Sequence, residues 1–263
     1  MTGLTGTDFL KTQTFVLLGA SNLTLAWPRI MSVIEAQTSG PREVFTAHGM
    51  GRSYIAERSS FGVRQLPGIL NSGLWSALRS ASAPAESPAV LITDLGNDLV
   101  FGSSPEEVAE GAAECVRRIR AWNRDTRIVL TAPPLKSVER LGQAGFIFFR
   151  SVLFPKCRLS LSDVQGHTRE LDERLSELSE QQSLTLFSPA SEWYGLDPIH
   201  IRRRYQREAF AAMTYPWNLV ETVGKIRKER RHRRPVAETR WVWGRERRTL
   251  QPSTDVRTAV YAY

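Results

Sequence analysis

Residues 14–24, Thr-Phe-Val-Leu-Leu-Gly-Ala-Ser-Asn-Leu-Thr, decide the fold class of this chain. The apolar run at residues 15–18 is bounded by turn-forming residues, and this pattern predicts a buried strand. Gly19 and Ala20 then predict a tight turn, and Ser21 follows where a helix can begin. In open α/β sheets this carboxyl edge of the strands is where ligands bind. Ser21 is therefore either a nucleophile or a helix cap, and the local sequence leaves both interpretations open.

Four more apolar runs repeat the pattern of the first along the chain. They predict strands at residues 43–47, 89–94, 127–131 and 184–187, and helical patterns cover residues 23–36, 68–79, 104–122, 168–181 and 205–213. Because strands and helices alternate, we expect an α/β fold whose central parallel sheet, of about five strands, has helices on both faces. Residues 137–165 have no clear pattern, and the aromatic run at 146–149 fits either a cover over a pocket or part of a core.

The composition predicts a globular protein of the reducing cytoplasm. Of the 263 residues, 41% are apolar, which is enough for a core, and no run is long enough to span a membrane. The first residues lack the pattern of a secretory signal. Two cysteines, Cys115 and Cys157, do not indicate structural disulfides. No cluster of His, Cys or carboxylates has metal-ligand spacing, so we expect neither a metal nor a cofactor.

The positive charge is concentrated at the end of the chain. Residues 225–263 hold twelve Lys and Arg against four acidic residues, which accounts for the whole net charge of +8 and leaves residues 1–224 formally neutral. We therefore expect a domain at 1–224 and a basic, Arg/Trp-rich C-terminal extension at 225–263. Such an extension can contact nucleic acid, an anionic membrane or another subunit, or simply be solvated, and the sequence commits to no specific partner. If the domain is autonomous, deleting residues 225–263 should leave its activity intact.

Four loops at predicted strand ends carry the residues that could do chemistry. A serine hydrolase needs a nucleophile, a base, a group that orients the base, and donors for the oxyanion. Ser21 can be the nucleophile, and Asp197-Pro-Ile-His200 contains an acid and a base three residues apart. Asn97 and amides near Ser21 and Gly51 could supply the donors. Because parallel strands end at one edge of a sheet, these loops could meet.

The set resembles the SGNH subgroup of the GDSL hydrolases, which carry serine, glycine, asparagine and histidine blocks in this order. The matching segments are Gly19-Ala-Ser-Asn22, Gly49-Met-Gly-Arg52, Gly96-Asn-Asp98 and Asp197-Pro-Ile-His200, and the resemblance spans roughly residues 14–213. It implies a flavodoxin-like three-layer α/β/α sandwich and ester hydrolysis without a metal.

By the same resemblance each site residue has a role. Ser21 would be the nucleophile, His200 the general base and Asp197 its orienter. The amides of Ser21 and Gly51 and the side chain of Asn97 would form the oxyanion hole.

The motifs also depart from the family pattern and leave alternatives open. Ala20 stands where the family usually has an acid, and Asn22 where leucine is common, so we expect an altered pocket with the chemistry retained. Gly49, Gly51 or Arg52 could present the oxyanion amide, and Gly51 is our choice. His48 and His167 are rival bases, and Asp98 is expected to brace its loop.

The sequence thus predicts a serine esterase or lipase-like hydrolase that forms an acyl-enzyme on Ser21. Small acyl esters, including acetylated carbohydrates, are the expected small-molecule substrates. The alternatives are an acyltransferase that uses the same site, or a catalytically silent domain whose basic tail binds nucleic acid or a membrane.

Overall fold

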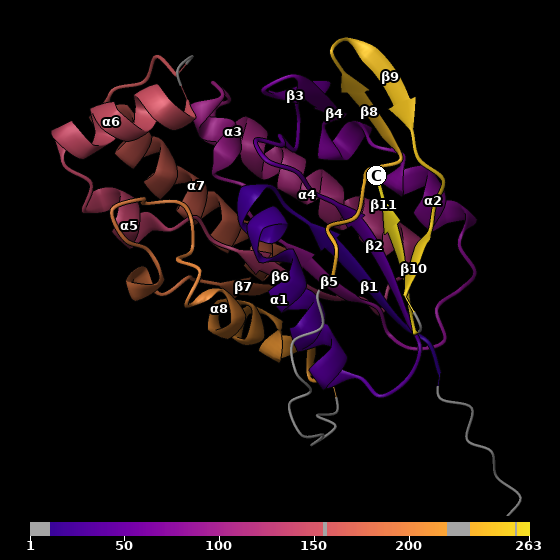
Figure 1. The fold of residues 1–263 in the computed structure, drawn as a ribbon. Coiled ribbons are helices and arrows are strands. Elements are labelled where there is room, and N and C mark those ends of the chain that lie inside the picture. The colour runs from indigo at the N-terminus through magenta and orange to yellow at the C-terminus, as the bar shows by residue number, and fades with distance from the viewer. Residues whose placement is uncertain (1–10, 155–156, 220–231, 256) are drawn as a thin grey trace, which may run out of the picture.

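The computed structural model describes residues 11–154, 157–219, 232–255 and 257–263. Its centre is a seven-stranded sheet in the order β10-β11-β2-β1-β5-β6-β7 (Figure 1). The strands of this sheet are β1 (Gln13–Leu18), β2 (Arg42–Ala47), β5 (Ala89–Ile92), β6 (Arg127–Thr131), β7 (Thr185–Phe187), β10 (Ser253–Asp255) and β11 (Thr258–Ala262). All neighbours pair in parallel except β10 and β11, which are antiparallel. The five predicted strands are therefore confirmed, and two C-terminal strands extend their sheet.

Helices cover both faces of the central sheet. They are α1 (Ser21–Gln37), α2 (Leu74–Ser80), α3 (Asn97–Val100), α4 (Pro105–Trp122), α5 (Leu135–Glu139), α6 (Gln143–Leu153), α7 (Leu161–Gln181) and α8 (Gln206–Thr214), with short 3₁₀ turns η1 (Ile69–Asn71), η2 (Ser191–Trp193) and η3 (Tyr215–Trp217). Among the described residues, none of these helices is long and apolar enough to cross a membrane.

Side-chain alternation along the buried strands builds the three layers. In β1, Val16 and Leu18 pack into one apolar cluster with α2, α4 and α7. Phe15 and Leu17 point to the opposite face and pack into a second cluster with α1 and α8. The expected three-layer α/β/α sandwich is confirmed.

The helix ends agree with the sequence in one case and differ in another. Ser104 and Glu107 form the capping box that starts α4 as predicted. The start expected for α7 at residue 168 is wrong, because the helix begins at Leu161. A second capping box, from Ser160 and Asp163, starts it there and carries the helix through Gly166.

A second, four-stranded antiparallel sheet lies beside the central one. It consists of β3 (Arg58–Phe61), β4 (Arg64–Pro67), β8 (Thr239–Val242) and β9 (Arg245–Arg248), in the order β3-β4-β8-β9. Two of its strands thus come from the C-terminal segment, and β11 pairs with β2 in the central sheet. The last part of the chain is therefore built into both sheets, which differs from the expected separate extension. The expected boundary near residue 224 itself lies outside the described residues.

Candidate active site

Ser21 is the first residue of the helix that follows the central strand β1. Ala20 occupies the N-cap position and makes no side-chain capping bond, so Ser21 is not the helix cap. The Ser21 side chain is almost fully buried, and its Oγ lies 2.9 Å from Nε2 of His200. The strand-turn-helix connection thus turns this hydroxyl toward a single imidazole.

His200 and Asp197 lie together on the loop between η2 and α8. Nδ1 of His200 is 2.7 Å from Oδ2 of Asp197, and Oδ1 of Asp197 accepts the amides of Ile199 and His200 at 3.0 and 3.1 Å. The carboxylate therefore fixes both its own loop and the imidazole. The structure brings Ser21, His200 and Asp197 into one hydrogen-bonded chain.

Opposing effects set the charge state of this His–Asp pair. Burial opposes charge on the His200 ring, but the hydrogen bond and charge of Asp197, with the charge of Asp94, outweigh it and raise the pKa of His200 above 6.5. Burial likewise opposes ionisation of Asp197, yet its bond to His200 and the loop amides lower its pKa. The pair is thus suited to hold an imidazolium beside a carboxylate once His200 accepts a proton.

Asp94, which sequence reasoning did not single out, caps α1 from the end of β5. Its Oδ2 accepts the amides of Ala20, Asn22 and Leu23 at 2.8, 3.1 and 3.4 Å. A carboxylate at a helix N-terminus is favourable, and these contacts replace the absent cap at Ala20. Asp94 has a φ of 67°, a conformation that costs energy for a residue other than glycine. The only sequence signal was an acid at the end of a buried strand.

Asn22 links the nucleophile's helix to the loop of the imidazole. Its Nδ2 donates to Oδ1 of Asp94 and to the carbonyl of Ile199, both at 2.8 Å, and its Oδ1 accepts the amide of Ile201 at 2.8 Å. Asn22 therefore holds the residues on both sides of His200. The departure from leucine at this position adds a polar link that an apolar side chain cannot make.

The three donors expected for the oxyanion hole have no hydrogen-bond partner among the described residues. They are the amide of Ser21, the amide of Gly51 and Nδ2 of Asn97. Asn97 is largely buried at the start of α3, and Gly51 has a φ of 64° in the loop after β2. Arg52, one alternative to Gly51, already donates its amide to the Gly49 carbonyl at 3.2 Å. Gly49 and Gly51 remain as donors from this loop.

The hydrogen bond of His48 goes to Thr24, whereas that of the Ser21 hydroxyl goes to His200. Its ring stacks on Trp27 with centroids 4.9 Å apart, and its Nδ1 lies 2.9 Å from Oγ1 of Thr24, one helical turn after Ser21. The Thr24 hydroxyl donates to the Ala20 carbonyl, so Nδ1 of His48 carries the proton. Burial and then the charges of Arg52, Arg64 and Arg234 lower the pKa of His48 to about 3. This ring is therefore neutral at pH 7.

The other rival base and Asp98 are also placed. His167 lies in α7, and its Nδ1 is buried without a hydrogen-bond partner among the described residues. The carboxylate of Asp98 accepts the Ser53 hydroxyl and the Tyr54 amide. Burial raises the pKa of Asp98 to about 6, although these hydrogen bonds oppose the shift. Asp98 thus ties its loop to residues 53 and 54.

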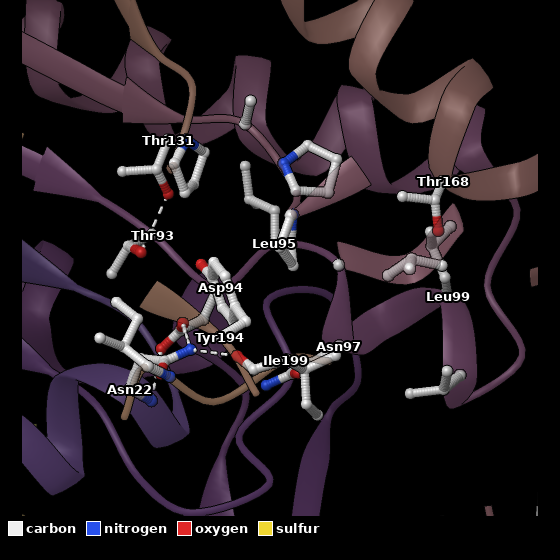
Figure 2. Close-up of a pocket in the computed structure, with 18 of the residues that line it drawn as sticks. Asn22, Thr93, Asp94, Leu95, Asn97, Leu99, Thr131, Thr168, Tyr194 and Ile199 are labelled. Atoms are coloured by element: carbon white, nitrogen blue, oxygen red, sulfur yellow. Dashed lines mark hydrogen bonds between the residues drawn. The ribbon is translucent and has the colours of Figure 1, made fainter. Parts of the chain in front are cut away.

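A small cavity of about 70 Å³ opens beside these residues. Asn22, Asn97 and Ile199 line it together with Tyr194 and side chains from β6 and α7 (Figure 2). Next to it lies an apolar cavity of about 50 Å³ under α6. Phe146 of α6 is buried against Val138 and Val164, whereas Ile147 and Phe148 are exposed. The run at residues 146–149 is therefore divided, with Phe146 in a small apolar core and Ile147 and Phe148 on the surface of α6.

Comparison with known proteins shows that the fold of this chain is similar to that of solved esterase structures. No protein-family model matches the sequence, and no curated protein does. Among solved structures, Est24, a carbohydrate acetylesterase from Sinorhizobium meliloti, is 16% identical with a TM-score of 0.54. The match covers 77% of this chain and 97% of Est24. The aryl esterase of M. smegmatis is 17% identical with a TM-score of 0.53, and the match covers 77% of this chain and 97% of the esterase.

The chain has the SGNH-hydrolase fold. This confirms the fold that the four sequence blocks implied. At these identities the likeness concerns the fold alone, so the activity has to be argued from the site.

Proposed function

We propose that this protein is a serine esterase that forms an acyl-enzyme on Ser21. The observation that carries the proposal is the hydrogen-bonded chain from Ser21 Oγ through His200 to Asp197, at 2.9 and 2.7 Å. His200 takes the proton of Ser21 as its oxygen attacks the ester carbonyl, and Asp197 stabilises the imidazolium. His200 then gives this proton to the leaving alcohol. Water attacks the acyl-enzyme in the second half of the reaction, again with His200 as base.

The oxyanion of each tetrahedral intermediate needs preorganised donors. We assign this role to the amides of Ser21 and Gly51 and to the side chain of Asn97. In support, none of the three has a hydrogen-bond partner among the described residues. The N-terminus of α1 adds a favourable dipole at the Ser21 amide.

The substrate that we propose carries a short acyl group, such as acetyl. The cavity lined by Asn22 and Asn97 is small, at about 70 Å³. Because the structurally similar Est24 is a carbohydrate acetylesterase, acetylated carbohydrates are the first class to test. Two unpaired thiols, Cys115 and Cys157, support the cytoplasm as the setting that we propose.

The test compares the protein with its Ser21→Ala variant. We expect the protein to hydrolyse 4-nitrophenyl acetate and to react with a fluorophosphonate. Loss of the nucleophile should remove the label and lower turnover by roughly 10³-fold or more. Equal turnover by the variant, or a label that persists without Ser21, contradicts the proposal. Adding an alcohol acceptor to the same assay distinguishes the acyltransferase alternative, because acyl transfer would then outpace release of acetate.

A further inference from the structure

The small sheet presents an arginine-rich face to the side of the candidate site. Cross-strand partners share a face, so Phe61, Arg64, Val242 and Arg245 lie in one row and Arg240 and Arg247 in the next on the same side. We call the side chains of Arg64, Arg240, Arg245 and Arg247 the arginine face. Figure 1 shows β3, β4, β8 and β9 at the same end of the molecule as α3.

Two packing contacts show that this face is turned toward the second sequence block. Leu66, two residues after Arg64 and on the same face, is buried against Gly49, where an added Cβ would lie 2.4 Å from Leu66 Cδ1. Phe61, the partner of Arg64, lies against Gly51 in the same way, at 3.6 Å. Since His48 of this loop contacts Thr24, the arginine face is close to the helix turn that holds Ser21.

Positive charge on this face lacks internal compensation. Arg240 and Arg247 stand directly opposite each other on β8 and β9, a like-charge pairing that destabilises a sheet. Among the described residues, Arg240 donates to the Ala237 carbonyl and the Thr249 hydroxyl. Within the described part of the chain, Arg64, Arg240, Arg245 and Arg247 form no ion pair with a carboxylate. Proteins keep such unfavourable like-charge pairs mainly at functional sites, so the pairing points to a ligand that supplies the missing negative charge.

The charge of the arginine face also shifts pKa values, both within the small sheet and in the loop of the second sequence block. Burial and then the charge of Arg240 lower the pKa of Arg64. Arg64 in turn contributes to the low pKa of His48, after burial and Arg52. Arg64 is thus an electrostatic neighbour of the loop that carries Gly49 and Gly51.

Single-stranded nucleic acid is the competing ligand for these arginines. Trp241 lies on the opposite face of the small sheet, and the guanidinium of Arg58 covers its ring at 4.0 Å from the centroid. A platform for single-stranded nucleic acid needs open aromatic rings among the cations. The ring of Trp241 is covered and lies away from the arginine face, whereas Phe61, in the row of Arg64, and Trp243, in the turn between β8 and β9, are exposed. We favour an anionic ester over nucleic acid because Leu66 and Phe61 of this face lie against the loop of Gly49 and Gly51.

We propose that the arginine face binds a carboxylate or phosphate group of the ester substrate whose acyl group is presented to Ser21. This inference rests on the proposed function and narrows its substrate to anionic esters. Arginine suits the role because its planar guanidinium bonds both oxygens of such groups.

The kinetic test uses a matched pair of substrates, acetylated trigalacturonate and the same trisaccharide with its carboxylates methyl-esterified. Release of acetate gives kcat/KM for each. We expect kcat/KM to be higher for the acidic form than for the methyl-esterified form. Arg64→Gln and Arg247→Gln should each lower this ratio of kcat/KM values, which we call the preference, about two- to five-fold, as for exposed charge pairs. Added salt should lower it as well.

The matched control is Arg248→Gln, a neighbour in the same strand on the opposite face. Arg248 pairs with Glu246 at 2.7 Å, so its loss should leave the preference unchanged. Thermal unfolding shows whether the variants fold, and Arg247→Gln should not lower Tm, because it removes a repulsion. No preference in the wild-type protein, or an equal effect of Arg248→Gln, overturns the inference.

Calorimetry with anions separates this inference from the proposed function, since binding needs no turnover. Trigalacturonate without acetyl groups and tripolyphosphate serve as probes, and the tighter binder identifies carboxylate or phosphate as the preferred group. Arg64→Gln and Arg247→Gln should weaken binding of that probe. If neither probe binds, or if only a single-stranded oligonucleotide binds through these arginines, the proposal is wrong.

Discussion

A single carboxylate, that of Asp94, organises the first turn of α1 from a neighbouring strand. It accepts three amides around Ser21 and one bond from the Asn22 side chain. It also contributes to the raised pKa of His200, after the opposing effect of burial and the stronger effect of Asp197. The position of the nucleophile and the charge of its base thus depend on the same residue.

Asp94→Asn should lower both kcat and the pH at which activity appears. His200 acts as base only when neutral, so the raised pKa makes kcat/KM rise with pH through a midpoint above 6.5 in the wild-type protein. Without the charge of Asp94 this midpoint should move down. The side chain of Asn has one acceptor oxygen where Asp94 has two, so either the backbone amides of α1 or Nδ2 of Asn22 would lose an acceptor. The free energy of unfolding should therefore fall by about 1–3 kcal/mol. The measurement is a pH profile on 4-nitrophenyl acetate.

Asp125→Asn, at an exposed aspartate after α4, is the control for a mere change in net charge. An unchanged midpoint in Asp94→Asn, with normal folding, would show that Asp94 does not act on His200.

Asp98 makes stability depend on pH in the opposite direction to an ordinary surface carboxylate. Its pKa is about 6 in the folded protein and near 3.8 when unfolded, so between these values the native state binds more protons. Stability should therefore fall as pH rises from about 4 to 6, by on the order of 2–3 kcal/mol from this group. Urea unfolding across this range should show that slope in the wild-type protein and lose it in Asp98→Asn. An identical slope in both would contradict the assignment.

At the scale of elements, the sequence predicted five parallel strands because each lies in an apolar run, and the longer helices because their apolar residues recur at helical spacing. The strands β3 and β4 were missed because they are mostly polar, as in Arg58-Ser-Ser-Phe61, whereas β5 has the same length but is entirely apolar. The site was predicted unevenly for a related reason. The roles of Ser21, Asp197 and His200 follow from short motifs. The roles of Asn22 and Asp94 depend on contacts with residues 71 to 179 positions away, which local sequence does not show.

The turn from β4 into η1 depends on Gly68. A Cβ at this position would lie 1.8 Å from the Ala56 carbonyl oxygen, a backbone atom that cannot rotate away. Gly68→Ala should destabilise the protein by about 1–3 kcal/mol or more through this overpacking. Gly166→Ala, in the middle of α7 with open space around it, should instead stabilise by roughly 0.5–1 kcal/mol. Urea unfolding of the two variants checks the contrast, and equal effects would contradict it.

At the scale of the whole molecule, the C-terminal segment completes structures begun much earlier in the chain. β11 covers the edge of β2, and Val260 is buried in the cluster with α1 and α8. The fully buried guanidinium of Arg52, in the second sequence block, donates to the carbonyls of Pro67 and Tyr263. The sequence analysis placed this segment outside the domain because its charge differs from that of residues 1–224. Net charge bears on solubility and on binding partners, but it does not predict which strands pair.

Deleting residues 225–263 should therefore destabilise the protein and reduce 4-nitrophenyl acetate hydrolysis, contrary to the expectation of an autonomous domain at 1–224. The deletion exposes the edge of β2 and removes an acceptor from the buried cation of Arg52, which is costly. The single substitution Val260→Ala, at a buried position of β11, should lower the free energy of unfolding by about 1–3 kcal/mol, whereas Val236→Ala at an exposed position should change it little. Urea unfolding measures all three. If residues 1–224 unfold at the same urea concentration as the full chain and retain its activity, the C-terminal strands contribute neither to folding nor to the site.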